Sequence, residues 1–420
     1  MTETSPPRWP RAPGFDATRA LLREGYDFGR HRFERLRSDV FETRLGLRRV
    51  MFVRGAEAAA MFYAPDRFTR HGAIPPTTLR LLQDVGSVQR LEGDAHRHRK
   101  AMFLSILGIA GTARLVTGFR EECTRGALAW AGQDAIVLRR EAALVLCRTA
   151  CRWAGVPLSE DEAARRARDL DALVEGAGAL GPRLWRGWQA RRRTERWIRG
   201  VIRLLRRMPE QHDTPAAAIA WHRDARGVLL EESSAAVELI NLLRPIVAIA
   251  VWITFVAHAL HVNPDIRERL RAGERGLTWR FVQEVRRFYP FFPAIAGRVR
   301  TPFEWRGRRF REGETVMLDL YASDHDPARW VSPERFEPDR FIAWPGSAFE
   351  LIPQGAGEAA RTHRCPGEEP SIALLMAAVD FLVNRVDYDV PPQPLDWRRN
   401  RFPAVPESGM RLRHVRLRTA

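Results

Sequence analysis

The sequence predicts a mainly α-helical fold with small β-sheets. From about residue 111 to 289, apolar residues recur mostly at helical spacing. Two shorter stretches, 42–55 and 303–320, alternate between apolar and polar residues as β-strands do. The chain is 45% hydrophobic and 28% charged, which is ordinary for a globular protein with a sizeable core. Since no linker or repeat divides the 420 residues, we expect one domain over 1–420, with 1–14 as a flexible N-terminus.

The expected elements follow one another in a simple order. Residues 42–55 alternate around Leu45-Gly46 and predict a β-hairpin, and a short helix begins at Gly55. Residues 303–320 predict strands with turns at Arg306-Gly307 and Glu312-Gly313. A proline-rich irregular region, 327–370, precedes a last apolar helix. The amphipathic stretches that predict long helices are 111–131, 135–153, 159–176, 184–207, 230–261 and 277–289.

The chain is strongly basic, with a formal charge of +17. Such a charge suggests a nucleic acid or an anionic surface as partner. However, Lys100 is the only lysine among 68 basic residues, and this uniform choice of arginine is typical of a GC-rich coding bias. The densest basic run, 183–207, also carries apolar residues at helical spacing. We therefore favour a solvated helix face over a nucleic-acid or lipid contact.

Neither a membrane span nor a secretory signal is indicated. No run reaches the roughly 18 apolar residues that a span requires. The N-terminal stretch MTETSPPRWPRAPG has no apolar core of the kind a signal peptide carries. We expect a cytoplasmic protein without integral membrane association.

One of the four cysteines stands apart from the others. Cys123, Cys147 and Cys151 lie in apolar helical patterns, where free thiols behave as small buried hydrophobes, and four cysteines do not make a disulfide framework. Cys365 lies between a glycine-rich loop and the start of a helix. A thiolate there is stabilised by the helix N-terminus and by Arg364, so Cys365 is a candidate ligand or nucleophile.

An arginine–proline pair interrupts the most apolar predicted helix. Pro245 cannot donate a hydrogen bond to the carbonyl of Asn241 and costs about 3 kcal/mol in a helix interior, so two helices meet here or one helix kinks. Arg244 has apolar neighbours on both sides, which predicts burial on at least one side. A buried guanidinium needs an anionic partner because it cannot lose its proton, whereas its stem could instead reach solvent. An exogenous carboxylate, bound through two hydrogen bonds, would suit its geometry.

The cysteine segment resembles a known haem-binding loop. Gly355-Ala356-Gly357, followed by His363, Cys365 and Gly367, is similar to the haem-ligand loop of the cytochrome P-450 superfamily. The resemblance implies that fold, thiolate-ligated haem b as cofactor, and Cys365 as the axial iron ligand. Five extra residues, 358–362, separate the glycines from the cysteine. This spacing is similar to that of bacterial hydrogen-peroxide-dependent fatty-acid hydroxylases and decarboxylases.

Other segments carry the same resemblance, which runs from about residue 15 to near the C-terminus. FVQEVRRFYPFFP contains Glu284 and Arg287, and FEPDRF contains Arg340. In the superfamily an equivalent glutamate and two arginines form a structural ion-pair network, although Glu-x-x-Arg alone is also a common exposed pair. The resemblance further implies that the haem propionates contact four basic residues: His96, Lys100, Arg298 and His363.

The resemblance also accounts for the arginine–proline pair. Superfamily members that activate O₂ usually carry an acidic residue and a threonine where Arg244 and Pro245 stand here, and an arginine cannot replace that acid. In the peroxide-using subgroup the Arg-Pro pair binds the substrate carboxylate. The implied substrates are a long-chain fatty acid and hydrogen peroxide, with no obligatory redox partner. The implied products are acids hydroxylated at the α and/or β carbon, with some decarboxylation to terminal alkenes.

A few residues are expected to shape the distal pocket. Gln89 matches a position where histidine is associated with decarboxylation, so glutamine favours hydroxylation. The candidates for the acyl tunnel, which could equally be core residues, are Leu81, Leu82, Val247, Phe291 and Phe292.

Two alternatives of other classes remain from the sequence. One is a conventional monooxygenase that uses O₂ and is fed by ferredoxin or flavodoxin. The other is non-enzymatic: a haem or fatty-acid binding protein, or a basic nucleic-acid binder in which Cys365 is an unligated thiol.

Overall fold

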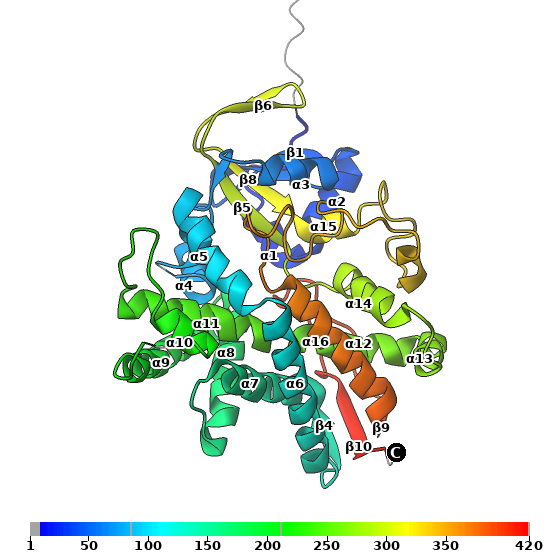
Figure 1. The fold of residues 1–420 in the computed structure, drawn as a ribbon. Helices are drawn as coiled ribbons and strands as arrows, with labels where there is room; N and C mark the ends of the chain where they lie inside the picture. Colours follow the sequence, from blue (N-terminus) through cyan, green and yellow to red (C-terminus); the bar gives the residue numbers. More distant parts are fainter. Residues whose placement is uncertain (1–8, 85, 211, 419–420) are drawn as a thin grey trace, which may run out of the picture.

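The computed structural model describes residues 9–84, 86–210 and 212–418 (Figure 1). Most of the N-terminal segment predicted to be flexible, residues 1–14, lies outside these ranges. In Figure 1 the larger sheet and the first helices lie at the top, and the long helices fill the lower part. The protein is mainly helical with small sheets, which confirms the predicted fold class.

The larger sheet has five strands in the order β1-β2-β8-β5-β3. Its first two strands, β1 (Val40–Leu45) and β2 (Arg48–Val53), form the predicted antiparallel hairpin. β8 (Thr315–Asp319) runs parallel to β2, and β5 (Ala294–Val299) pairs antiparallel with β8. The fifth strand is β3 (Phe68–Thr69), and β6 (Phe303–Trp305) with β7 (Arg308–Phe310) forms a separate hairpin.

A three-stranded sheet lies near the C-terminus. It has the order β4-β10-β9 and consists of β4 (Ala135–Val137), β10 (Arg411–Leu417) and β9 (Val386–Asp389). The prediction of a helix from residue 135 is therefore wrong for its first three residues, because they pair with β10 from the far end of the chain.

The predicted long helices are present, with ends shifted by a few residues. They are α6 (Ile109–Trp130), α7 (Leu138–Ala154), α8 (Glu160–Ala177), α9 (Pro182–Leu205), α14 (Leu277–Phe288) and α16 (Glu368–Asp380), the last followed by a π-helical turn (Phe381–Arg385). The remaining helices are α1 (Thr18–Glu24), α2 (Asp27–Leu36), α3 (Ala56–Tyr63), α4 (Pro76–Leu82), α5 (Gly93–Ile106), α10 (Pro215–Ala220), α13 (Pro264–Arg271) and α15 (Leu320–Asp324), with short 3₁₀ turns at Val88–Arg90 and Pro338–Phe341.

The apolar stretch that contains Pro245 forms the central helices, α11 (Glu232–Ala248) and α12 (Ala250–Val262). Together they are long and apolar enough to cross a membrane, but 94% of their most apolar window is buried inside the molecule. Pro245 does not end α11; the break between the helices comes at Ile249, one turn later. Between residues 235 and 260, Pro245 is the one side chain that is not buried.

Glu284 and Arg287 pair in the core rather than on the surface, and the partly accessible Arg340 reaches the same carboxylate. Arg287 donates to both carboxylate oxygens of Glu284, at 2.7 and 2.8 Å, and Arg340 Nε lies 3.2 Å from the same carboxylate. Glu284 and Arg287 are fully buried. Because Arg340 belongs to the irregular region after α15, these bonds tie that region to α14.

We expect Glu284→Gln to lower the free energy of unfolding by about 3–5 kcal/mol, since it keeps the size of the side chain but leaves Arg287 buried without an anion. Urea unfolding followed by circular dichroism measures the change. Glu304→Gln is the matched control, because Glu304 is exposed and forms no ion pair with any described residue. Equal stability of the two variants would contradict a structural role for the Glu284 network.

Candidate functional site

Cys365 lies at the end of a tightly held loop, two residues before the N-cap of α16. Its backbone N–H donates to the carbonyl of Gln354 at 3.0 Å. Burial raises the pKa of the Cys365 thiol, whereas the backbone N–H of Gly367 and the charge of Lys100 oppose that rise. A positively charged partner bound to the sulfur would therefore favour its thiolate form.

Two glycines of this loop adopt backbone conformations that other residues rarely take. Gly355 has φ +95°, and a Cβ there would lie 2.5 Å from the hydroxyl of Tyr63. Gly357 has φ +80°, and a Cβ there would lie 2.8 Å from Thr362 Cγ2. The extra residues between the glycines and the cysteine form a turn in which Thr362 Oγ1 bonds to the carbonyls of Ala356 and Glu358. The insertion is thus an ordered part of the loop.

A buried ionic network, which the sequence analysis missed, connects the cysteine loop to α14. Arg286 is 2% exposed and donates to Glu368, Gln283 and, at 3.2 Å, Gln354. Glu368 in turn accepts from Arg364 Nε at 2.6 Å. The arginine immediately before Cys365 and the start of α16 are therefore fixed to the same helix that carries the Glu284 network.

Four basic side chains gather beside the cysteine loop. The rings of His96 and His363 lie 4.1 Å apart, and Lys100 Nζ donates to the carbonyls of Thr362 and Arg364. Burial, Lys100 and Arg70 lower the pKa of His96 to about 4. Burial, followed by Arg70, His96 and Lys100, lowers the pKa of His363. Neither imidazole has a hydrogen-bond partner among the described residues, so the cluster could accept anionic groups.

The fourth predicted basic residue, Arg298, is not part of this cluster. It is exposed on β5 and its Nε lies 3.4 Å from the carbonyl of Gly313. Arg70 lies beside the cluster instead: its guanidinium donates to the carbonyl of Ala296 at 2.8 Å and lies near both histidines. The contact of Arg298 with a haem propionate stays a prediction. Arg70 lies in the stretch FTRHG, which matches no motif that would indicate a binding residue.

Arg244 is buried, and no carboxylate among the described residues pairs with it. It is 6% exposed, and its one hydrogen bond within the described part of the chain runs from Nη1 to the carbonyl of Leu81, at 3.0 Å. Burial and then the neighbouring Arg191 lower the pKa of Arg244, whereas Cys365 acts in the opposite direction. A desolvated cation with a single neutral acceptor is unfavourable unless an anion binds it. An anionic ligand would therefore supply the partner that the described residues do not provide.

Gln89 contacts Asn241 of α11, which lies one helical turn before Arg244. Its Oε1 accepts from Nδ2 of Asn241 at 3.3 Å, and the same Nδ2 lies 3.2 Å from Glu238. Glu238 is fully buried and pairs with Arg99 at 2.9 Å. A carboxylate only accepts hydrogen bonds, so Glu238 orients the side chain of Asn241 with its amide nitrogen toward Glu238 and Gln89. Because Gln89 accepts from that nitrogen through its oxygen, its own N–H groups stay available to other partners. Sequence reasoning found Gln89 but not this support.

The proposed tunnel residues fall into two groups. Leu81 and Val247 are fully buried in the main core, and Leu81 faces Arg244 with its carbonyl rather than its side chain. Leu82, Phe291 and Phe292 are partly accessible. Phe291 stacks on Trp252 of α12, with ring centroids 3.9 Å apart. These three side chains remain candidates for contact with an apolar substrate.

Comparisons with known proteins agree with this arrangement. Residues 274–393 match the family model for cytochrome P-450. The structure of cytochrome P-450SP alpha (CYP152B1) in complex with (R)-ibuprophen is 44% identical, covers 96% of this chain and 100% of its own, and superimposes with a TM-score of 0.93. The chain belongs to the cytochrome P-450 family. The family predicted from the cysteine loop is thus confirmed.

Two other solved P-450 structures are similar over nearly the whole chain. Cytochrome P-450EX alpha (CYP152N1) with myristic acid is 40% identical, covers 98% of this chain and 100% of its own, and has a TM-score of 0.94. Cytochrome P-450 OleT in complex with arachidonic acid is 30% identical, covers 99% and 100%, and has a TM-score of 0.94. Among curated relatives, cytochrome P-450 71A8 of Mentha piperita is 32% identical over 129 residues, which span 30% of this chain and only 25% of the relative.

The residues present fit the haem that the family implies. Cys365 supplies a sulfur at the N-terminus of α16, and His96, Lys100, His363 and Arg70 form a basic cluster that could bind the two carboxylates of the haem propionates. Pro245 is the accessible point of an otherwise buried helix, as expected where a flat group packs against α11. Haem bound here would be held by its iron on one side and by its propionates at one edge.

We expect Arg286→Gln to loosen haem binding, since Arg286 fixes the loop that carries the iron ligand. Loss of such an outer contact typically weakens a metal site by about ten- to a hundredfold. The rate of haem transfer to apomyoglobin measures this change. Arg271→Gln, on exposed α13, is the control. If haem leaves both variants at the wild-type rate, the Arg286 network does not support the loop.

Proposed function

We propose that this cytochrome P-450 is a fatty-acid peroxygenase. It uses hydrogen peroxide to hydroxylate long-chain fatty acids at the α and/or β carbon, with some decarboxylation to terminal alkenes as a secondary outcome. The observation that carries the proposal is Arg244, a buried cation that has no anion among the described residues. The next residue, Pro245, can supply neither a hydroxyl nor an N–H.

The substrate head group is assigned to Arg244. A fatty-acid carboxylate can accept two parallel N–H···O bonds from its guanidinium, and Leu81 keeps the guanidinium in place through its carbonyl. Low exposure makes each of these charge-assisted bonds stronger than at the surface. The held carboxylate then provides, at its own oxygen atoms, the acid–base group that takes a proton from hydrogen peroxide. The substrate therefore completes the site.

Haem with a thiolate ligand supplies the O–O cleavage chemistry when it is bound, and the thiolate is the one that Cys365 provides. The family implies haem, and we propose haem b as its form. The Arg286 and Glu368 contacts position this cysteine, and the basic cluster would hold the propionates of the cofactor.

Head-group binding also determines the position of oxidation. A carboxylate fixed at Arg244 leaves its Cα and Cβ nearest the reacting centre, so attack close to the head group is expected. The acyl chain adds affinity without changing this geometry, at about 0.8 kcal/mol for each buried methylene. We assign the supporting apolar contacts to Leu82, Phe291 and Phe292. Gln89, oriented through Asn241, favours hydroxylation over decarboxylation.

The similar structures support a fatty acid as substrate, since two of them contain one: myristic acid in cytochrome P-450EX alpha and arachidonic acid in cytochrome P-450 OleT. Both are similar to this chain over nearly its whole length. A cytoplasmic location and independence from redox partners remain predictions.

The test is turnover of a series of saturated fatty acids with hydrogen peroxide and no reductase. We expect α- and β-hydroxy acids, identified by mass spectrometry. Activity that needs NAD(P)H and a ferredoxin or flavodoxin, with peroxide inert, would instead establish the conventional monooxygenase. No turnover with either oxidant, together with a histidine-type haem spectrum, would favour the binding protein.

A further inference from the structure

The outer face of α9 is unusually cationic. The helix contacts α8, α10, α11 and α4 on its inner side, and Figure 1 shows it at the edge of the helical part. Trp185, Arg192, Arg196, Arg199 and Arg203 follow one another at spacings that place them on one side of a helix. The buried residues of α9, from Gly187 to Leu205, lie on the opposite side. We call the five outward residues the α9 face.

Protein carboxylates leave most of this charge unneutralised. Arg192, Arg196 and Arg199 form no ion pair and no side-chain hydrogen bond with any described residue, and Arg203 lies 3.9 Å from Glu232. The one acidic residue in α9, Glu195, bonds instead to the buried Arg191 at 2.6 Å. Three or four guanidinium groups are therefore available to an external anionic surface.

Two exposed apolar side chains lie at the N-terminal end of α9. Leu180, in the turn between α8 and α9, is 68% exposed, and Trp185 is 60% exposed. Aromatic and aliphatic side chains beside unpaired basic ones are typical of helices that rest in the interface of a bilayer. On a face that only contacts water, these two side chains would expose apolar surface without any compensating contact.

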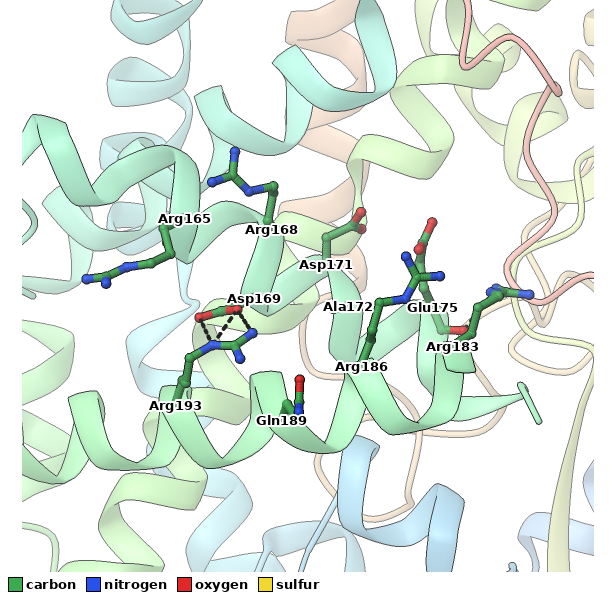
Figure 2. A pocket seen from close by; sticks show the side chains of 10 residues that line it. All are labelled: Arg165, Arg168, Asp169, Asp171, Ala172, Glu175, Arg183, Arg186, Gln189 and Arg193. Carbon is green, nitrogen blue, oxygen red and sulfur yellow. Dashed lines mark hydrogen bonds and ion pairs between the residues drawn. The ribbon is translucent and has the colours of Figure 1, made fainter. Parts of the chain in front are cut away.

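A hollow of about 510 Å³ lies beside the α9 face, between α8 and α9 (Figure 2). Of its arginines, Arg193 is bound to Asp169, at 2.6 Å for the shortest contact, as the dashed lines in Figure 2 show. Arg168 and Arg186 have no such partner among the described residues. Because Asp171 and Glu175 also line the hollow, these two arginines extend the cationic surface beside the α9 face and do not form a closed phosphate site.

We propose that the α9 face docks on the surface of an anionic lipid bilayer, with Leu180 and Trp185 inserted among the head groups. The sequence favoured a solvated helix face for this basic run. The structure adds that its outer arginines lack carboxylate partners among the described residues and that Leu180 and Trp185 are exposed beside them. A nucleic acid could also bind the unpaired arginines, but its phosphates would make no favourable contact with the exposed Leu180.

The position of this surface suits a lipid substrate, and this part of the inference rests on the proposed function. Gly176 of α8 and Gly187 of α9 pack so closely on Leu81 that a Cβ on either would lie 3.0 or 3.2 Å from Leu81 Cδ1. Leu81 is also the residue whose carbonyl binds Arg244. The docked edge therefore belongs to the helix whose inner side packs on the segment that borders the head-group site, so a docked protein would hold that segment near the bilayer.

Binding of the haem-loaded protein to vesicles tests the docking without any turnover. We expect co-sedimentation with vesicles that contain phosphatidylglycerol, little with pure phosphatidylcholine, and weakening as salt is raised. The triple variant Arg192→Gln/Arg196→Gln/Arg199→Gln should bind on the order of a hundredfold more weakly, because each basic residue near an anionic surface contributes roughly a fivefold factor. Leu180→Gln/Trp185→Gln should also weaken binding, with less dependence on salt.

The matched control is Arg48→Gln/Arg49→Gln/Arg309→Gln, which removes the same charge from exposed residues of the β-sheet part. Equal loss of vesicle binding in both triple variants would overturn the proposal, since net charge alone would then explain it. So would binding to duplex DNA that depends on the three α9 arginines in the absence of vesicle binding. Because no substrate is present, failure of the peroxygenase assay leaves this result unaffected.

Discussion

Replacing Cys365 with serine is expected to abolish peroxide-driven turnover and to remove the thiolate signature of the haem. Thiolate-ligated haem shows a strongly red-shifted Soret band when it is reduced under CO, and a serine hydroxyl does not give this band. Serine is nearly the same size as cysteine, so the loop held by Gln354, Lys100 and Arg364 should fold as before. The loss therefore reports on the electron donation of sulfur rather than on the fold.

The control for this change is Cys147→Ala, since Cys147 is fully buried in α7, away from the cysteine loop. Its haem spectrum and turnover should match those of the wild type, with at most a small loss of stability. A red-shifted band retained by Cys365→Ser would mean that another residue is the axial ligand. The haem-loop assignment would then be wrong, whereas family membership would stand.

The sequence could predict the fold because its strongest signals are local. Helical periodicity located α6 to α9 and α14, and the Leu45-Gly46 turn located the first hairpin. It misassigned residues 135–137, since those residues become a strand only by pairing with β10 near the other end of the chain. Pro245 is a similar case: burial of α11 on all other sides keeps the helix continuous through a residue that disfavours it.

The site shows the same division between local motif and distant contact. Cys365, His363 and Arg244 could be found because a motif or an odd residue marks each of them. Arg70, Glu238 and Arg286 could not, because their roles depend on partners brought close by folding. Arg286 reaches Glu368 across 82 positions, and Glu238 reaches Arg99 across 139. A buried arginine or glutamate has no distinctive neighbours in the sequence, so only its partners identify it.

Replacing Arg244 with alanine is expected to raise the Kd for a long-chain fatty acid by about a hundredfold or more, because the carboxylate then loses a buried, charge-assisted partner. Peroxide-driven turnover should fall to background, since an unanchored carboxylate no longer supplies its acid–base group. Arg244→Lys should be intermediate, because it keeps the charge but loses the paired N–H donors. Arg309→Gln, an exposed arginine of β7, should leave both quantities unchanged.

The stability of the Arg244 variants separates binding from folding. In the substrate-free protein Arg244 is a desolvated cation whose single hydrogen-bond partner among the described residues is a carbonyl, so Arg244→Leu should keep or increase the free energy of unfolding. A fatty acid should raise the melting temperature of the wild type, which binds it when folded, and should not raise that of the variant. If the variant is as active as the wild type, Arg244 does not bind the head group; if it loses stability by several kcal/mol, Arg244 is a structural residue. The expected combination, a more stable protein without activity, is what results when a site keeps an unpaired charge for its substrate.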